Sequence, residues 1–242
     1  MSEMSARKAI LISCGSFNPP TNAHLRMMEL ARDELQSLPS PYSVVEGIYS
    51  PVTSTYVHKP LASDEHRLKM LEKATQSSGW TRADGWEIER GVWSRTLEVL
   101  THHRKEARLR WKDSSLDCFL VAGGDLVESF GRILPDGKRL WAAEDVKAIV
   151  EEYGLVIIQR LGSDPSATLH SFGLSSKKSH SVEETTCPND VSSTRLRSAI
   201  AEGKSIRYTT PDAVVDYIHK HGLYQRPVNG MMHGMNGTAS HV

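Results

Sequence analysis

Two separated stretches of the chain carry residue types that suit the binding of phosphate groups. The first is GSFNPPTNAH, residues 15–24, which follows the apolar run 9–12. That run predicts a strand buried on both faces, and the glycine and prolines after it end the strand. Thr21 or Asn22 then caps a helix, so His24 falls in its first turn. Unpaired backbone N–H groups and the positive end of the helix dipole make this turn an anion site, to which His24 adds a donor.

The second stretch is NDVSSTRLR, residues 189–197. Ser192 or Ser193 is expected to cap a helix, which places Arg197 about one turn inside it, beside hydroxyl groups and free N–H groups. Such a helix start is a second anion site. Taken alone, each stretch is also compatible with an ordinary capped helix and a solvated side chain. Their pairing in one small protein favours a shared polyphosphate ligand.

A polyphosphate held between two helix starts suits phosphoryl and nucleotidyl transfer. These reactions depend on in-line positioning and on neutralising the charge of the equatorial and leaving oxygens. No Ser-His-Asp or Cys-His arrangement can be recognised in the sequence, which fits a direct displacement. The chain also lacks a GxxxxGK[ST] and a GxGxxG motif, so neither a P-loop nor the dinucleotide-binding fingerprint is expected.

The composition limits the class of protein. The 242 residues are 39% hydrophobic and 24% charged, as in ordinary soluble domains. Basic and acidic residues number 29 each, so no net field favours nucleic acid or membranes, and the basic run 104–112 is interpreted as a solvated helix end. Cys14, Cys118 and Cys187 are far apart, which argues for reduced thiols. With no signal-peptide core in residues 1–8 and no membrane-spanning stretch, we expect an intracellular protein, cytoplasmic or nuclear or both.

Apolar strands alternate with amphipathic helices across residues 9–160. This pattern predicts a single α/β domain over residues 1–225, with a Rossmann-like, doubly wound parallel sheet and helices on both faces. Gly123 and Gly124 follow one buried strand and let a ligand approach the backbone there. Residues 226–242 lack any period and are expected to form a disordered tail. The strands are predicted at 9–12, 42–49, 116–122 and 155–158, and the main helices at 21–35, 63–75, 126–130, 144–153, 192–202 and 211–221.

Three stretches have weaker patterns. Residues 76–91 are expected to be irregular. A helix is predicted to start near Val92, with Trp93 and two leucines on one face, where an aromatic residue is usually part of the core. Residues 161–181, rich in Ser and Gly, are expected to form a mobile loop with one short strand at most.

The first stretch resembles the signature of the nucleotidyltransferase superfamily, in which a T-x-x-H or H-x-G-H element binds the phosphates of a nucleoside triphosphate. Residues 15–35, GSFNPPTNAHLRMMELARDEL, are similar in particular to the opening of the eukaryotic nicotinamide/nicotinate mononucleotide adenylyltransferases. NDVSSTRLRSAI, followed by SIRYTTPDAVVDYIHKHGLY, resembles their carboxyl-terminal signature. Shorter matches in the same order are SPV, GGDLVESF, LW and YGLVIIQR. The resemblance covers nearly all of residues 9–225.

The resemblance implies that the AMP moiety of ATP is transferred to nicotinamide or nicotinate mononucleotide by direct in-line attack, giving NAD or deamido-NAD and pyrophosphate. His24 and Arg197 would be the catalytic residues, both acting on the phosphates. Further contacts are implied residue by residue: backbone of Gly15, Ser16 and Phe17 to the dinucleotide; Ser193 and Thr194 with Arg197 to the β- and γ-phosphates; Trp93, Thr96, Leu140 and Trp141 around the pyridine ring; Gly123, Asp125 and Asn189 on the adenosine side; and Arg160 near the adenine.

One element departs from the family pattern. The family has S-P-V-x-x-x-Y-x-K, whereas Tyr56 is followed here by Val57 and His58, with Lys59 one place later. Either His58 or Lys59 reaches the phosphates, or that contact is lost. The segment between residues 104 and 116 is also too short for the insertion that carries a nuclear-localisation signal in some relatives.

The expected cofactor is Mg²⁺, held mainly by phosphates and water, with no protein metal ligands. The expected partners are ATP, the two mononucleotides, NAD and pyrophosphate, without nucleic acid or membrane. The oligomeric state is open, a homo-oligomer included, and so is the preference for the amide or the acid. Two alternatives stand beside this interpretation. One is a sister adenylyl- or cytidylyltransferase with another phosphate-ester acceptor, against which Trp93 and Trp141 argue. The other is a non-catalytic nucleotide-binding or chaperone-like protein, against which His24 and Arg197 argue.

Overall fold

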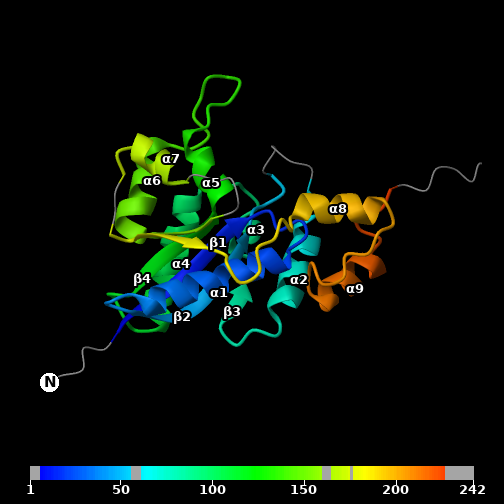
Figure 1. The fold of residues 1–242 in the computed structure, drawn as a ribbon, viewed down its shortest axis with the longest axis horizontal. Coiled ribbons are helices and arrows are strands. Elements are labelled where there is room, and N and C mark those ends of the chain that lie inside the picture. The colour runs from blue at the N-terminus through cyan, green and yellow to red at the C-terminus, as the bar shows by residue number, and fades with distance from the viewer. Residues whose placement is uncertain (1–5, 56–60, 160–164, 175–176, 227–242) are drawn as a thin grey trace, which may run out of the picture.

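The computed structural model describes residues 6–55, 61–159, 165–174 and 177–226 (Figure 1). Within these ranges, six strands form one sheet in the order β3-β2-β1-β4-β5-β6, and every neighbouring pair is parallel. This confirms the predicted doubly wound α/β fold. The strands are β1 Arg7–Gly15, β2 Tyr42–Pro51, β3 Thr81–Ala83, β4 Asp117–Gly123, β5 Leu155–Gln159 and β6 Ser179–Glu183.

Helices connect the strands and extend beyond the last one. The α-helices are α1 Asn22–Ser37, α2 Asp64–Thr75, α3 Trp86–Glu89, α4 Thr96–Arg110, α5 Gly124–Glu128, α6 Ala143–Ala148, α7 Pro165–Ser171, α8 Ser193–Ala201 and α9 Asp212–Lys220. A 3₁₀ turn, Ser129–Gly131, follows α5, and a π-helical turn, Ile149–Tyr153, follows α6. Gly154, with φ of 129°, ends that segment as its sequence predicts.

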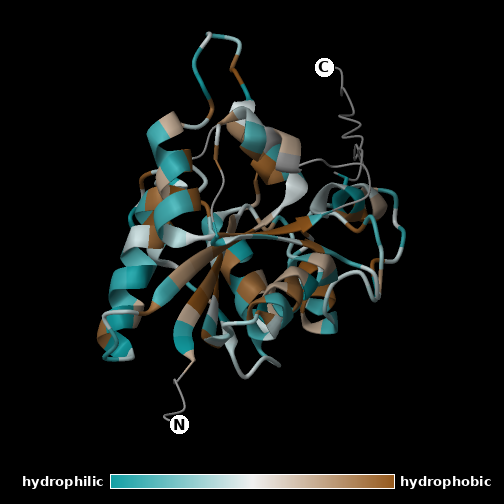
Figure 2. Cartoon of the chain, turned by 60° about the vertical axis from the view of Figure 1, so that its left-hand side comes forward, coloured by the Kyte–Doolittle hydropathy of each residue, from teal (hydrophilic) through white to brown (hydrophobic). Residues whose placement is uncertain are grey.

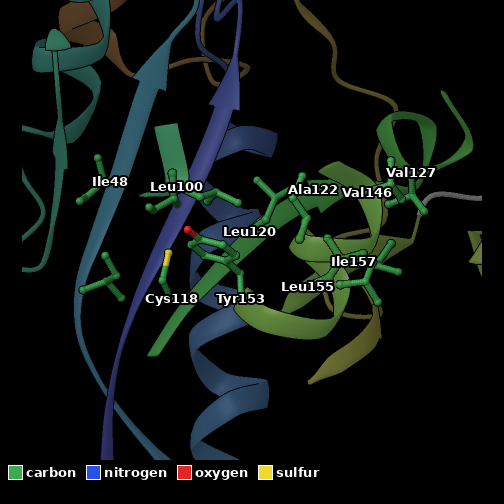
Figure 3. Packing of buried hydrophobic residues seen from close by; sticks show 14 of the residues in the cluster. Ile48, Leu100, Cys118, Leu120, Ala122, Val127, Val146, Tyr153, Leu155 and Ile157 are labelled. Atoms are coloured by element: carbon green, nitrogen blue, oxygen red, sulfur yellow. The ribbon is translucent and has the colours of Figure 1, made fainter. Parts of the chain in front are cut away.

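The sheet is buried on both faces. Alternate residues of β1 point to opposite sides, so Ile10 and Ile12 pack beneath α4 to α7, whereas Ala9 and Leu11 pack beneath α1 and α2. Figure 3 shows part of the apolar cluster on the side of the sheet that α4 to α7 cover, where Leu120 and Leu155 lie close to Tyr153. In Figure 2 the strands are mostly apolar along their length and the outer helix faces are polar, as a sheet covered on both sides requires.

The last two helices extend this two-sided sandwich. Leu196 of α8 and Val214 and Ile218 of α9 pack with Met70 and Ala74 of α2 in a separate apolar cluster. In Figure 1, α8 and α9 lie beside α2, at the opposite side of the molecule from α5, α6 and α7. Burial of this cluster fixes the start of α8 relative to the sheet.

The strand order predicts a ligand-binding position at the carboxyl ends of β1 and β4. The order reverses between these two strands, which is where open α/β sheets bind their ligands. Ile12 of β1 is level with Leu120 of β4. Gly15 ends β1 and Gly123 ends β4, so both glycines lie at the carboxyl edge of the sheet.

The weakly patterned stretches differ from expectation. Residues 76–91 contain β3 and α3 and are not irregular throughout. The next helix, α4, begins at Thr96 and not near Val92, so Trp93 precedes it and is 49% exposed. Residues 161–181 contain α7 as well as β6. The predicted tail, apart from Arg226, lies outside the described residues. None of the helices in the described part of the chain is both long and apolar enough to span a bilayer.

Candidate active site

The residues 15–21, here called the signature turn, leave the end of β1 and enter α1. Phe17 has φ of 44°, an unusual value for a residue with a side chain, and its ring is almost fully buried. The ring packs edge-on against His24, with centroids 5.2 Å apart, and against Tyr49, at 5.7 Å. The Tyr49 hydroxyl in turn donates to the carbonyl of His24 at 3.3 Å. Aromatic packing therefore holds the turn against the first turn of α1.

His24 is held by the residue that caps its own helix. Thr21 is the N-cap, and its backbone N–H donates to His24 Nδ1 at 3.0 Å, while its Oγ1 lies 2.7 Å from the same nitrogen. A backbone N–H can only donate, so Nδ1 is an acceptor and the neutral imidazole carries its proton on Nε2. His24 thus presents an Nε2–H donor at the start of α1, where the helix dipole also favours an anion.

The second predicted anion site meets the first directly. Ser192 caps α8, and the side chains that follow it reach the signature turn. Ser193 Oγ donates to the carbonyl of Pro19 at 2.8 Å, and Arg197 Nη1 donates to the carbonyl of Asn18 at 2.8 Å. Arg197 Nη2 also donates to Thr194 Oγ1 at 3.3 Å. The structure therefore brings His24, Ser193, Thr194 and Arg197 to one turn.

Other carboxyl-terminal residues complete this contact. Thr210 Oγ1 donates to the carbonyl of Pro20 at 2.9 Å, and the Asn22 N–H donates to the carbonyl of Thr209 at 2.9 Å. The buried Asn18 accepts on Oδ1 from the Tyr224 hydroxyl at 2.7 Å. Burial raises the pKa of Tyr224 above its ordinary value, so this hydroxyl stays a donor. The sequence did not indicate Thr210, Tyr224 or Asn18 as part of the site.

On the predicted adenosine side, Gly123 is the last residue of β4 and Asp125 lies in the first turn of α5. A Cβ at Gly123 would lie 2.6 Å from Asp125 Oδ1, a contact that rotation of the Asp125 side chain can relieve. Asn189 is exposed, in the loop that leads to α8. Its amide bonds locally, from Nδ2 to the carbonyl of Cys187 at 2.8 Å and from the Val191 N–H to Oδ1 at 3.1 Å. These bonds shape the loop that precedes the second anion site.

The residues predicted to enclose the pyridine ring come from two neighbouring segments. Trp93 lies just ahead of α4 and Thr96 is its first residue, whereas Leu140 and Trp141 lie at the base of the hairpin that precedes α6. Trp141 packs edge-on against Phe130, with centroids 4.8 Å apart, and its Nε1 donates to Ser129 Oγ at 3.0 Å. An ion pair links the start of α4 to α6: the charged atoms of Arg95 and Asp145 are 3.5 Å apart.

Two titratable groups lie near the carboxyl ends of β1 and β2: Glu87, which is buried, and Cys14, which is partly buried. Glu87 of α3 is 2% exposed, and burial raises the pKa of its carboxyl to about 7, although a hydrogen bond from Ser50 Oγ at 3.3 Å opposes the shift. Burial, followed by the charge of Glu87, raises the pKa of the Cys14 thiol well above its ordinary value. A protonated thiol is a poor nucleophile, so Cys14 offers no covalent route.

Arg67 is the buried basic residue that the sequence interpretation missed. It lies on α2 at positions −3, −4 and −7 from Met70, Leu71 and Ala74, on the apolar side of the helix. A charged residue on an apolar helix face must be paired, and this spacing was the signal that could have found it. His58, Lys59 and Arg160 lie outside the described residues, so their predicted contacts stay predictions.

A cavity of about 700 Å³ opens on another side of α1, lined among others by Asn22, Arg26, Trp80 and Asn189. Most of its polar side chains already bond to protein groups: Asn22 to the carbonyl of Tyr208, Arg26 to Glu184, and Trp80 to Glu29. The signature turn does not line it. We therefore place the candidate site at the carboxyl end of β1, where the two predicted anion sites meet.

Comparison with known proteins shows which family the chain belongs to. A family model described as cytidylyltransferase-like matches residues 12–199. Over 224 residues the chain is 46% identical to nicotinamide/nicotinic acid mononucleotide adenylyltransferase 2 of Caenorhabditis elegans, covering 91% of this chain and 99% of that one. The chain belongs to the nicotinamide/nicotinic acid mononucleotide adenylyltransferase family. It is also 39% identical to the Arabidopsis thaliana adenylyltransferase of that name, with 89% of each chain covered.

Solved structures related to this adenylyltransferase family share the fold. Nicotinic acid mononucleotide adenylyltransferase of Plasmodium falciparum, solved in complex with NaAD, matches with a TM-score of 0.64 at 20% identity. The match covers 90% of this chain and 98% of that chain. A second structure of the same protein, complexed with APC, matches with a TM-score of 0.61. The relatives confirm the family expected from the two signatures, and the solved structures confirm the fold.

Proposed function

We propose that the protein transfers the AMP moiety of ATP to nicotinamide mononucleotide, nicotinate mononucleotide or both. The observation that carries this proposal is the meeting of the two anion sites, in which Ser193 and Arg197 bond to the carbonyls of the turn that leads to His24. Together with membership of the adenylyltransferase family, this favours an enzyme with a triphosphate substrate over a non-catalytic protein that keeps the fold.

The reaction is a direct displacement. A phosphate oxygen of the mononucleotide attacks the α-phosphorus of ATP, a new P–O bond forms, and the bond from that phosphorus to the bridging oxygen of the β-phosphate breaks. Pyrophosphate leaves with the negative charge. His24 donates from Nε2 to a phosphate oxygen, and the start of α8 with Arg197 neutralises the leaving pyrophosphate. The backbone of Gly15, Ser16 and Phe17 lies against the dinucleotide as it forms.

We propose that Mg²⁺ accompanies the nucleotide. The described residues include no group of three or more His, Cys, Asp or Glu side chains that could hold a metal ion. His24, Ser193, Thr194 and Arg197 all carry hydrogen-bond donors, which suit phosphate oxygens and not a cation. A hard cation with few protein ligands is usually held by phosphate oxygens and water, where it neutralises charge on the triphosphate.

The test is pyrophosphate release by the full chain with ATP and Mg²⁺, using each mononucleotide in turn. We expect release with at least one mononucleotide and formation of the matching dinucleotide. Turnover only with a different phosphate ester would favour a sister nucleotidyltransferase. Calorimetric binding of NAD without any pyrophosphate release would favour a non-catalytic protein.

Fluorescence microscopy of the tagged chain in cells tests the proposed cytoplasmic or nuclear location.

A further inference from the structure

Arg67 has the least exposed charged side chain in the described part of the chain. It lies on α2, its side chain is 0% exposed, and it heads the fully buried side chains ranked by volume. Burying a guanidinium is unfavourable unless its donors are all used. Burial lowers the pKa of Arg67, and the adjacent Asp64 carboxylate opposes that shift, so the group remains a cation in the fold.

All three guanidinium nitrogens donate to protein oxygens. Nη1 donates to the carbonyl of Ser16 at 3.0 Å, in the signature turn. Nε donates to the carbonyl of Ala62 at 3.1 Å, ahead of α2. Nη2 donates to the carbonyl of Val52, just after β2, and to Asp64 Oδ1. One side chain therefore joins the signature turn, the loop that follows β2 and the residues just ahead of α2.

Asp64 extends the same network. Its Oδ1 accepts from the Ser54 N–H at 2.6 Å, and its Oδ2 accepts from Thr53 Oγ1 at 3.1 Å. The Ala62 N–H donates to Asn18 Oδ1 at 3.2 Å, which returns the network to the signature turn. The Arg67–Asp64 pair thus sets the position of the turn relative to the loop that follows β2.

The bond to Ser16 has a consequence for the opposite side of the same peptide. In a trans peptide the C=O and the N–H point in opposite directions. Because the Ser16 carbonyl is turned inward to Arg67, the Phe17 N–H is turned away from Arg67. Among the described residues, no acceptor is hydrogen-bonded to that N–H. The left-handed φ of Phe17 adds to this geometry, since successive N–H groups in such turns converge on anions.

We propose that Arg67 is a positioning residue for adenylyl transfer: it fixes the Ser16–Phe17 peptide so that the turn presents its N–H to a phosphate of the nucleotide. This rests on the proposed function, because it assigns the group that the peptide meets. Arg67 itself touches no substrate. Its effect is on the placement of the reacting phosphates, for which displacements of about 1 Å can cost as much as 100-fold in rate.

The test compares Arg67→Lys with wild type and with Arg108→Lys. Lys keeps the charge but supplies one nitrogen in place of three, so it cannot hold Ser16, Val52 and Ala62 together. Arg108 is the control, because this partly buried arginine also donates to a backbone carbonyl, that of Leu116 at 3.0 Å, but at the amino end of the sheet. Each variant is assayed well below its melting temperature, with activity expressed per folded molecule.

For Arg67→Lys we expect kcat to fall by about 10- to 100-fold and the Kd for ATP, measured by calorimetry, to rise. The KM for the mononucleotide should stay within about twofold, and Arg108→Lys should match wild type. Wild-type kcat and ATP affinity in folded Arg67→Lys would overturn the positioning role and leave the proposed function intact. A wild-type protein that neither binds ATP nor releases pyrophosphate would overturn both. Should Arg67→Lys not fold, Asp64→Asn decides, with a smaller loss in the same direction expected and an unchanged kcat refuting the role.

Discussion

Arg197 donates a hydrogen bond from Nη1 to the carbonyl oxygen of Asn18, 2.8 Å away across 179 residues of sequence. The bond uses one edge of the guanidinium and ties the start of α8 to the turn ahead of α1. A phosphate bound at this place meets two helix starts at once, so each adds its dipole and its side-chain donors to the same charge.

Replacement of Arg197 should weaken use of the phosphates that leave. In Arg197→Ala we expect kcat/KM for ATP in the forward reaction, and for pyrophosphate in the reverse reaction, to fall by about 10- to 100-fold, the scale of a charge-assisted contact. Arg195→Ala is the control, since Arg195 lies on the same helix, is exposed and pairs with Asp190 at 3.3 Å. Equal kinetics of the two variants in both directions would rule out the triphosphate role of Arg197.

Loss of the His24 imidazole should act on the chemical step. In His24→Ala we expect kcat to fall by about 10²–10³, the usual effect of removing one preorganised donor. Stopped-assay measurement of pyrophosphate at saturating substrates checks this. Full turnover in this variant would show that His24 is not catalytic.

Thr21 should affect both stability and rate, because its hydroxyl caps α1 and lies against His24 Nδ1. Thr21→Val keeps the shape and the backbone N–H but removes the hydroxyl. Loss of the cap is expected to lower the free energy of unfolding by about 1 kcal/mol. The freed imidazole should lower kcat by roughly tenfold. Thr21→Ser should retain both properties, and a Val variant with normal kcat would leave the cap as the only role of this hydroxyl.

Trp93 should affect the mononucleotide and not ATP. In Trp93→Ala we expect the KM for the mononucleotide to rise by about tenfold, the scale of one lost aromatic stacking contact, with the KM for ATP within about twofold. Trp111→Ala is the control, because this partly exposed tryptophan lies at the far end of α4. A rise in the KM for ATP alone would contradict the predicted contact of Trp93 with the pyridine ring.

Two buried groups give opposite dependences of stability on pH. The raised pKa of Glu87, about 7, means that the folded state binds more protons than the unfolded state between about pH 4.5 and 7. The free energy of unfolding should therefore fall as pH rises through this range. Burial lowers the pKa of His103 to about 4, so its contribution should rise with pH between about 4 and 6.5.

Substitution separates these two contributions. Glu87→Gln should be more stable relative to wild type at pH 8 than at pH 5, by on the order of 2 kcal/mol, in urea unfolding at the two pH values. Glu89→Gln, on the exposed side of the same helix, should show little change between them. A constant difference for Glu87→Gln across this range would mean that Glu87 is ionised in the fold.

The sequence predicted elements best where side-chain period and caps agreed. Ser63 and Ser192 cap their helices as expected, and the apolar runs became the central strands. The misses came where long-range pairing decides the structure. β3 has only three residues and owes its form to pairing with β2, and the polar β6 pairs with β5 at the sheet edge. At α4, the spacing of Trp93 to its leucines was coincidental, because the chain is still extended at Arg95, the cap residue.

The candidate site was predictable where the two signatures carry it, since His24, Ser193 and Arg197 reach one turn. Most of the residues that hold the signature turn in place could not be predicted from the sequence. Thr210 and Tyr224 act through contacts with residues about two hundred positions earlier, which no local pattern encodes. Arg67 is different, because an arginine among the apolar positions of a helix is recognisable as unusual from its spacing alone.

The signature turn takes most of its side-chain partners from the last part of the chain, from Ser193 to Tyr224. During synthesis the amino-terminal strands leave the ribosome first and can begin to pair. The turn gains the partners that lie between Ser193 and Tyr224 only when Tyr224 has cleared the exit tunnel. A nascent chain therefore builds its sheet before it can hold a nucleotide, and competence to bind ATP marks completion of translation through this segment.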